Sequence, residues 1–149
     1  MGDAAPEFTL ASTAGENVSL RDVLDRGPAL IAFFPLAFTS TCTTELCAFT
    51  EDFDAFRASG VTILPISVDS VPTLREFKAK HAMRSDLLSD FKRDVSRNYG
   101  VLLEDRFYST RAYFLVDREG IVRWAHVEET PGHRRENAEI LERIAGLDR

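Results

Sequence analysis

Two cysteines, Cys42 and Cys47, are the residues of this chain whose side chains could do the most demanding chemistry. Two cysteines are too few to stabilise a small secreted fold through disulfides. The N-terminal residues also show neither the basic nor the apolar segment of an export signal. We therefore favour thiol chemistry over a structural disulfide, and we expect a cytoplasmic location.

Cys42 is either a buried core residue or a reactive thiol. Four positions separate it from Leu46, so it shares the apolar face of the helix that follows, and this supports a core role. Against that role, Cys42 follows an apolar run over residues 28–35 and lies among hydroxyl residues typical of a helix N-terminus. The first turn of a helix stabilises a thiolate, so we favour a reactive thiol in polar surroundings.

Cys47 lies five residues after Cys42. In a regular helix the two Cα atoms would be about 8.6 Å apart, calculated from a rise of about 7.5 Å and a rotation of about 140°. A disulfide requires less than about 7 Å, so the pair can close only if the helix unwinds. Cys47 is therefore either an inert cysteine or a second thiol that captures an oxidised Cys42 after local unfolding.

The elements that must position these thiols alternate between strands and helices. Apolar runs predict strands buried on both faces at residues 29–34 and 61–69. A 3–4 spacing predicts a helix that begins within residues 39–44, with Cys42 in its first turn, and ends at Gly60. The other expected elements are a hairpin over residues 8–20, a helix capped by Ser70, a short strand at 87–90, a hairpin over 112–128, and a helix after residues 130–132 with Ala138, Leu141 and Ile144 facing inward. This order predicts one α/β domain over residues 1–149, with a central mixed sheet flanked by helices and an N-terminal hairpin. Pro65 lacks a ladder donor, so we expect a bulge or an edge there.

Composition excludes several other classes of function. The chain has 149 residues and a net charge of −6 with no long basic block, which argues against a nucleic-acid partner. No apolar run is long enough to span a membrane. His81, His126 and His133 are scattered and show no metal-ligand spacing, so we expect no metal and no other cofactor.

Two motifs resemble those of the peroxiredoxin family. Pro35, Thr39 and Cys42 match the pattern P-x-x-x-T-x-x-C, and Arg111 opens a segment similar to R-x-x-F-x-x-D-x-x-G. Residues 34–39 are most similar to the alkyl hydroperoxide reductase E branch. The position of Cys47 instead resembles the bacterioferritin-comigratory, or Q-type, branch.

This resemblance implies a thioredoxin-like fold and the reduction of hydrogen peroxide and organic hydroperoxides. Cys42 would attack the peroxide and become a sulfenic acid, Thr39 and Arg111 would bind the substrate, and Pro35 would shield the thiolate from water. Cys47 is the candidate resolving cysteine, and a thioredoxin- or glutaredoxin-like protein would be the reductant. Family members occur as monomers and as homodimers.

Three alternatives remain at this point. A one-cysteine mechanism would use an external thiol in place of Cys47, and a redox sensor would use oxidised Cys42 as a signal. A thiol–disulfide exchange protein would need a closer pair than the C-x₄-C spacing provides.

Glu45 either orients Arg111 or is a solvated acid in the first turns of the helix.

Overall fold

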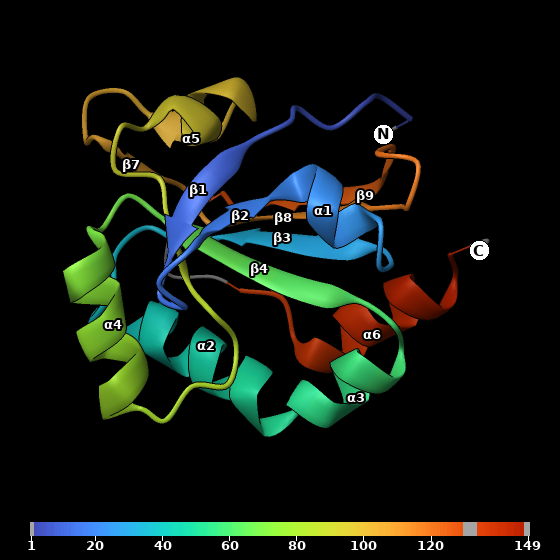
Figure 1. Cartoon of the computed structure of the whole chain (residues 1–149), viewed down its shortest axis with the longest axis horizontal. Helices are drawn as coiled ribbons and strands as arrows, with labels where there is room; N and C mark the ends of the chain where they lie inside the picture. The colour runs from blue at the N-terminus through green and yellow to red at the C-terminus, as the bar shows by residue number, and fades with distance from the viewer. Residues whose placement is uncertain (1, 130–133, 148–149) are drawn as a thin grey trace.

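The computed structural model describes residues 2–129 and 134–147. A mixed sheet of seven strands forms its centre, in the order β2-β1-β5-β4-β3-β8-β9 (Figure 1). Its strands are β1 (Thr9–Ser12), β2 (Asn17–Ser19), β3 (Ala29–Phe33), β4 (Thr62–Ser67), β5 (Leu88–Ser89), β8 (Ala112–Val116) and β9 (Val122–Val127). Because β3 pairs parallel with β4 and antiparallel with β8, the predicted mixed α/β sheet is confirmed.

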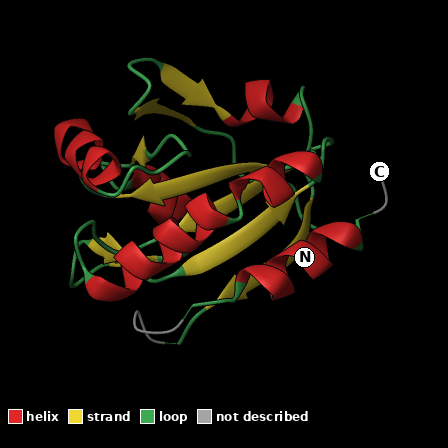
Figure 2. Ribbon diagram, turned by 90° about the horizontal axis from the view of Figure 1, so that it is seen from below, coloured by secondary structure: helices red, strands yellow, loops and turns green. Residues whose placement is uncertain are grey.

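Helices cover both faces of this sheet. The helices are α1 (Leu20–Leu24), α2 (Ser40–Glu51), α3 (Phe53–Ala58), α4 (Val71–Lys80), α5 (Asp94–Asn98) and α6 (Asn137–Ala145). Buried side chains of α2, α3, α4 and α6 form one core cluster, and those of α1 and α5 form a second cluster on the other face. The view from below in Figure 2 shows helices lying across the sheet. Within the described residues, no helix is both long enough and apolar enough to cross a membrane.

The sequence of β3 is apolar without interruption because both faces of this strand are buried. Leu30 and Ala32 belong to the first core cluster, whereas Ala29, Ile31 and Phe33 belong to the second. All five residues are buried, since alternate side chains enter two different cores. Because β3 lies between β4 and β8, the loop that follows it begins at an inner strand of the sheet.

Both predicted hairpins are present. Strands β1 and β2 pair antiparallel, with Thr9 opposite Ser19, and β8 pairs antiparallel with β9. Helix α4 begins where its cap was expected, because the Ser70 hydroxyl accepts a hydrogen bond from the Thr73 amide. A further two-stranded sheet, β6 (Leu102–Leu103) with β7 (Tyr108–Ser109), was not predicted.

The helix predicted to begin within residues 39–44 and to end at Gly60 does begin there, at Ser40, but it is wrong as a single element. It is broken at Asp52, whose backbone dihedral angles of −102° and 17° end α2 and start α3. The apolar spacing survives the break, because Phe49 and Phe56 still enter the same cluster and their rings pack edge to face. Periodicity alone did not reveal the break.

The inward face predicted for the last helix is confirmed for Ile144, which is buried, and for Leu141, which packs partly buried against the first core cluster. It is wrong for Ala138, which is exposed, and the prediction omitted the buried residues Asn137 and Ile140. Asn137 is buried despite its polarity because its amide nitrogen donates to the Ala48 carbonyl oxygen at 2.8 Å. The turn predicted at residues 130–132 and His133 lie outside the described residues.

Pro65 fits β4 without a bulge. The amide of Phe34 donates to the Ile66 carbonyl oxygen and that of Thr62 donates to the Pro28 carbonyl oxygen, so even-numbered residues of β4 face β3. Pro65 therefore faces the other side, where β5 pairs only with Ile66 and Ser67. Strand β4 has a local edge at Pro65, as expected for a residue with no N–H to donate.

Candidate active site

Cys42 lies in the first turn of α2, directly beyond the end of β3. A short loop over residues 34–39 joins the two elements, and Asp69, at the end of β4, holds it in place. The Asp69 carboxylate accepts hydrogen bonds from the Ala37 amide and the Ser67 hydroxyl, both at 2.8 Å. Cys42 itself is 1% exposed. The fold thus fixes a buried thiol at the N-terminus of a helix, where the helix dipole stabilises negative charge.

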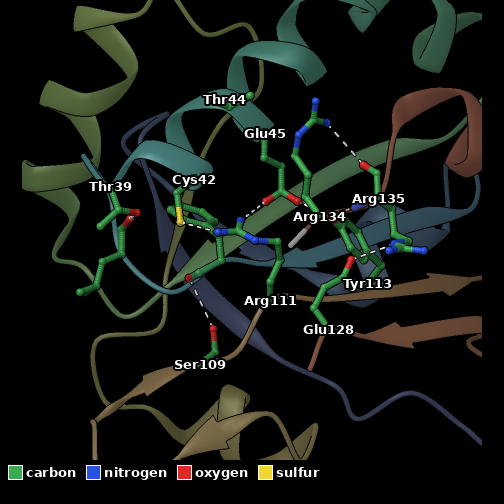
Figure 3. A network of polar contacts seen from close by, with 12 residues as sticks. Thr39, Cys42, Thr44, Glu45, Ser109, Arg111, Tyr113, Glu128, Arg134 and Arg135 are labelled. Carbon is green, nitrogen blue, oxygen red and sulfur yellow. Dashed lines mark hydrogen bonds and ion pairs between the residues drawn. The ribbon is translucent and has the colours of Figure 1, made fainter. Parts of the chain in front are cut away.

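Arg111 approaches this thiol from the neighbouring strand. It directly precedes β8, which pairs with β3 so that Ala112 lies opposite Phe33. Its Nη2 donates to Cys42 Sγ at 3.0 Å, and its side chain is 1% exposed (Figure 3). A guanidinium at this distance stabilises a thiolate and also any negative charge that develops on a nearby oxygen.

Glu45 fixes the orientation of Arg111. Its Oε1 accepts from Arg111 Nη1 at 2.6 Å, and both side chains are 1% exposed. Burial raises the pKa of Glu45, while the Arg111 charge and a hydrogen bond from Tyr113 act against that rise. Of the two alternatives left open by the sequence, Glu45 is therefore a buried partner of Arg111 and not a solvated acid.

Arg111 stays charged in this arrangement. Desolvation lowers its pKa, but the Glu45 carboxylate and the Cys42 sulfur outweigh that effect, so the pKa of Arg111 is raised. Glu45 is consequently the member of the pair that can take up a proton on acidification, since the guanidinium is already protonated. The fork of the guanidinium binds both groups at once, with one nitrogen on the carboxylate and the other on the sulfur.

The structure brings Thr39 and Pro35 to the same helix N-terminus. Thr39 is the residue at the N-cap of α2, but its side chain makes no capping hydrogen bond. Its hydroxyl instead donates to the Leu36 carbonyl oxygen at 2.8 Å, so the oxygen lone pairs remain to accept a proton donor. Pro35 is buried within the loop over residues 34–39, and Thr39 is exposed at the end of that loop.

Cys47 is separated from this group. It lies one and a half turns further along the same helix, is partly buried against the core, and forms no disulfide with Cys42. Burial, and then the charge of Glu51, raise the pKa of the Cys47 thiol. In the reduced protein Cys47 is therefore a thiol held away from the Cys42–Arg111 pair.

Alkylation can test this description of Cys47. In a Cys42→Ser variant, the rate of reaction with iodoacetamide should rise with a midpoint above the ordinary thiol value of about 8.5. Glu51→Gln should lower that midpoint, because it removes a negative charge that disfavours the thiolate. A midpoint at or below the ordinary value would contradict the environment described for Cys47.

The polar surroundings predicted for Cys42 are present only in part. The Arg111 guanidinium contacts the sulfur, but the rest of the residue lies in the apolar cluster that contains Leu46 and Phe49. The hydroxyls of two residues near it in the sequence bind main-chain oxygens: that of Thr39 donates to the Leu36 carbonyl oxygen, and that of the exposed Thr44 donates to the Ser40 carbonyl oxygen at 3.0 Å. A helix distributes consecutive residues over different faces, so neighbours in sequence are not neighbours in space.

Tyr113 belongs to the site and was not predicted from the sequence. It is fully buried, and its hydroxyl donates to Glu45 Oε2. The signal that could have found it is strand alternation, because Tyr113 lies two residues after Arg111 and so points to the same face of the sheet. Figure 3 shows Arg111 between Cys42 and Glu45, with Tyr113 on the far side of Glu45.

Comparison with known proteins gives consistent results. Residues 1–125 match the AhpC/TSA family. The chain is 35% identical to alkyl hydroperoxide reductase E of Mycobacterium bovis, covering 99% of this chain and 97% of that protein. It is 31% identical to the chloroplastic 2-Cys peroxiredoxin BAS1 of Hordeum vulgare over 82% of this chain, and spans 63% of the length of that protein. The crystal structure of peroxidoxin BcpB from Mycobacterium tuberculosis superposes with a TM-score of 0.88 at 26% identity, covering 99% of this chain and 97% of that one.

Proposed function

Because this chain belongs to the AhpC/TSA family and is a peroxiredoxin, a thiol-dependent peroxidase, we propose that Cys42 is its peroxidatic residue. The observation that carries the proposal is the 3.0 Å contact between Arg111 Nη2 and Cys42 Sγ in a buried site. Glu45 is bound through the other terminal nitrogen, Nη1, so the carboxylate and the sulfur are held by different nitrogens of the same guanidinium. The arrangement supports a thiolate held ready in the reduced enzyme.

The first step moves two electrons from sulfur to the peroxide. The Cys42 thiolate attacks one oxygen, an S–O bond forms, and the O–O bond breaks. The departing oxygen leaves as hydroxide or alkoxide and takes up a proton to become water or an alcohol. Cys42 is left as a sulfenic acid, which is the first and reversible level of cysteine oxidation.

The remaining residues would hold the peroxide in line with the sulfur. The Thr39 oxygen, whose own proton is directed to Leu36, would accept the hydroxyl proton of the peroxide. Arg111 would stabilise the charge that develops on the departing oxygen, and the N-terminal amides of α2 would add to this. Pro35, a buried residue of the loop, would fix the loop and keep water from the sulfur.

The second half of the cycle would use Cys47. Its thiol would attack the Cys42 sulfenic acid, forming a disulfide and releasing water. A thioredoxin- or glutaredoxin-like dithiol would then reduce that disulfide and become oxidised itself. This cycle needs a compartment that keeps thiols reduced, so we place the protein in the cytoplasm.

A stoichiometric titration tests the function. One equivalent of hydrogen peroxide should remove free thiol from the reduced protein within seconds, whereas oxidised glutathione at the same concentration should remove far less. A thiol–disulfide exchange protein would give the opposite order. Thiol loss with no sustained consumption of peroxide in the presence of a dithiol reductant would favour a redox sensor.

Intact-mass analysis tests the role of Cys47. Peroxide-treated wild type should lose two hydrogens through a Cys42–Cys47 disulfide, whereas Cys47→Ser should retain a sulfenic acid and go on to a sulfinic acid with excess peroxide. Glu51→Gln, which changes a neighbour of Cys47 but keeps both thiols, serves as a control and should still form the disulfide. A stable sulfenic acid in the wild type would indicate a one-cysteine mechanism with an external thiol.

A further inference from the structure

Tyr113 is the buried side chain at the site for which the proposed mechanism has no use. Its hydroxyl donates to Glu45 Oε2 and accepts a hydrogen bond from the Arg135 main-chain N–H at 2.9 Å (Figure 3). Burial, and then the Glu45 carboxylate, raise the pKa of the phenol, so it remains a neutral donor at any working pH. Neither of these two hydrogen bonds joins Tyr113 to Cys42 or to the place where a peroxide would bind.

We propose that Tyr113 is a positioning residue, which acts by holding Glu45 against Arg111 and thereby keeps both Arg111 and helix α2 in the form that oxidises fastest. The inference rests on the proposed peroxidase mechanism and deepens it. A carboxylate bound through one oxygen can rotate about its last side-chain torsion. With Oε2 bound to Tyr113, Oε1 stays on Nη1 of Arg111, and Nη2 stays on the sulfur.

The hydroxyl of Tyr113 is itself oriented by the chain around it. Because the phenol oxygen accepts from the Arg135 amide, its single proton is left to point at Glu45. Arg135 is held through its side chain, whose Nε donates to Glu128 Oε2 at 2.8 Å. The Glu128 amide in turn donates to the Arg111 carbonyl oxygen at 2.9 Å. A closed ring of contacts therefore returns from Tyr113 to the residue that it positions.

The place of Glu45 in the sequence gives Tyr113 a second effect. Glu45 lies between Cys42 and Cys47 in α2, so the unwinding that would bring the two sulfurs together must pull its carboxylate away from Arg111 and Tyr113. A contact that favours the first oxidation thus opposes the opening of the helix. Removal of the Tyr113 hydroxyl should slow oxidation of Cys42 and, at the same time, make α2 open more often.

A tryptophan that packs against Tyr113 can report on this site by its fluorescence. It contains a single tryptophan, Trp124. The Trp124 ring stacks on that of Tyr113, with ring centroids 6.2 Å apart and an angle of 26° between the planes. Tyr113→Phe keeps the ring and therefore the stacking, so Trp124 fluorescence can follow oxidation of Cys42 in both proteins.

The test compares Tyr113→Phe with a matched control. Tyr99→Phe also removes a hydroxyl that makes a hydrogen bond, here to the Pro6 carbonyl oxygen at 2.7 Å, but its ring packs in the core on the other face of the sheet. In stopped-flow mixing with hydrogen peroxide, Tyr113→Phe should oxidise about 10-fold more slowly than wild type, since it loses a hydrogen bond to a buried charge. Hydrogen exchange of the amides of residues 43–47 in the reduced protein should become several-fold faster. Tyr99→Phe should change neither quantity.

A double variant separates positioning from a general loss of structure. If Tyr113 acts through Glu45, Tyr113→Phe should slow oxidation no further in a Glu45→Gln background. Additive losses, an unchanged oxidation rate, or unchanged exchange at residues 43–47 would each overturn the proposal. The peroxidase function would survive any of these results, because it fails only if wild type does not consume peroxide or if the variant without the Cys42 thiol still does.

Discussion

Cys42→Ser is expected to abolish peroxide consumption, lowering turnover by at least about 1000-fold. A serine hydroxyl is not ionised at neutral pH, so no nucleophilic anion would face the peroxide. Serine has nearly the same size, and Arg111 can still donate to its oxygen, so the buried site should remain filled. Peroxide loss in the presence of a dithiol reductant is the measurement, with circular dichroism and the thermal midpoint confirming the fold.

Cys47→Ser is the matched control for this variant. It makes the same chemical change in the same helix, five residues away, at a position that no contact links to Arg111 in the described site. Its first oxidation by peroxide should proceed at close to the wild-type rate, even though recycling differs. Turnover near the wild-type value in Cys42→Ser would remove the basis for assigning Cys42 as the peroxidatic residue.

The order of elements could be read from the sequence because each buried strand has a local signature. Strand β3 is apolar throughout because both faces of the sheet are covered, and such an apolar run can be recognised in the sequence alone. The break at Asp52 was not visible, because Phe49 and Phe56 keep a helical spacing across it. The burial of Asn137 on α6 could not be predicted, because it depends on hydrogen bonds that only the tertiary structure reveals.

In the site too, features that depend on neighbouring residues could be predicted, whereas contacts between residues far apart in the sequence could not. The position of Cys42 at a helix start follows from the residues around it, and the structure agrees. Its contact with Arg111 does not follow from them, since Arg111 lies 69 positions away and reaches the sulfur from the end of another element. The pairing of Glu45 with Arg111 spans 66 positions, and that of Glu45 with Tyr113 spans 68, so the sequence offered Glu45 only as one of two alternatives.

The buried pair of Arg111 and Glu45 complicates any test of Arg111, because it combines a catalytic contact with a structural one. Removal of the guanidinium alone leaves the Glu45 carboxylate buried without its partner, which typically costs about 3–5 kcal/mol of folding free energy. A slow Arg111→Ala enzyme would therefore be ambiguous if it were also partly unfolded. Neutralising both partners avoids the unpaired charge, and buried pairs replaced in this way are often no less stable.

Arg111→Ala is expected to slow oxidation of Cys42 by about 100-fold, the loss typical of one preorganised charge partner removed from a buried site. Arg111→Lys should fall between this variant and wild type, because one ammonium group cannot reproduce the fork that binds Glu45 and Cys42 together. Arg111→Met combined with Glu45→Gln should recover most of the thermal stability and remain as slow as Arg111→Ala. The measurement is the second-order rate with hydrogen peroxide, taken alongside the unfolding midpoint of each variant. If the rate recovered together with stability in the double variant, Arg111 would be a structural residue, since a guanidinium that stabilises the thiolate cannot be replaced by a thioether.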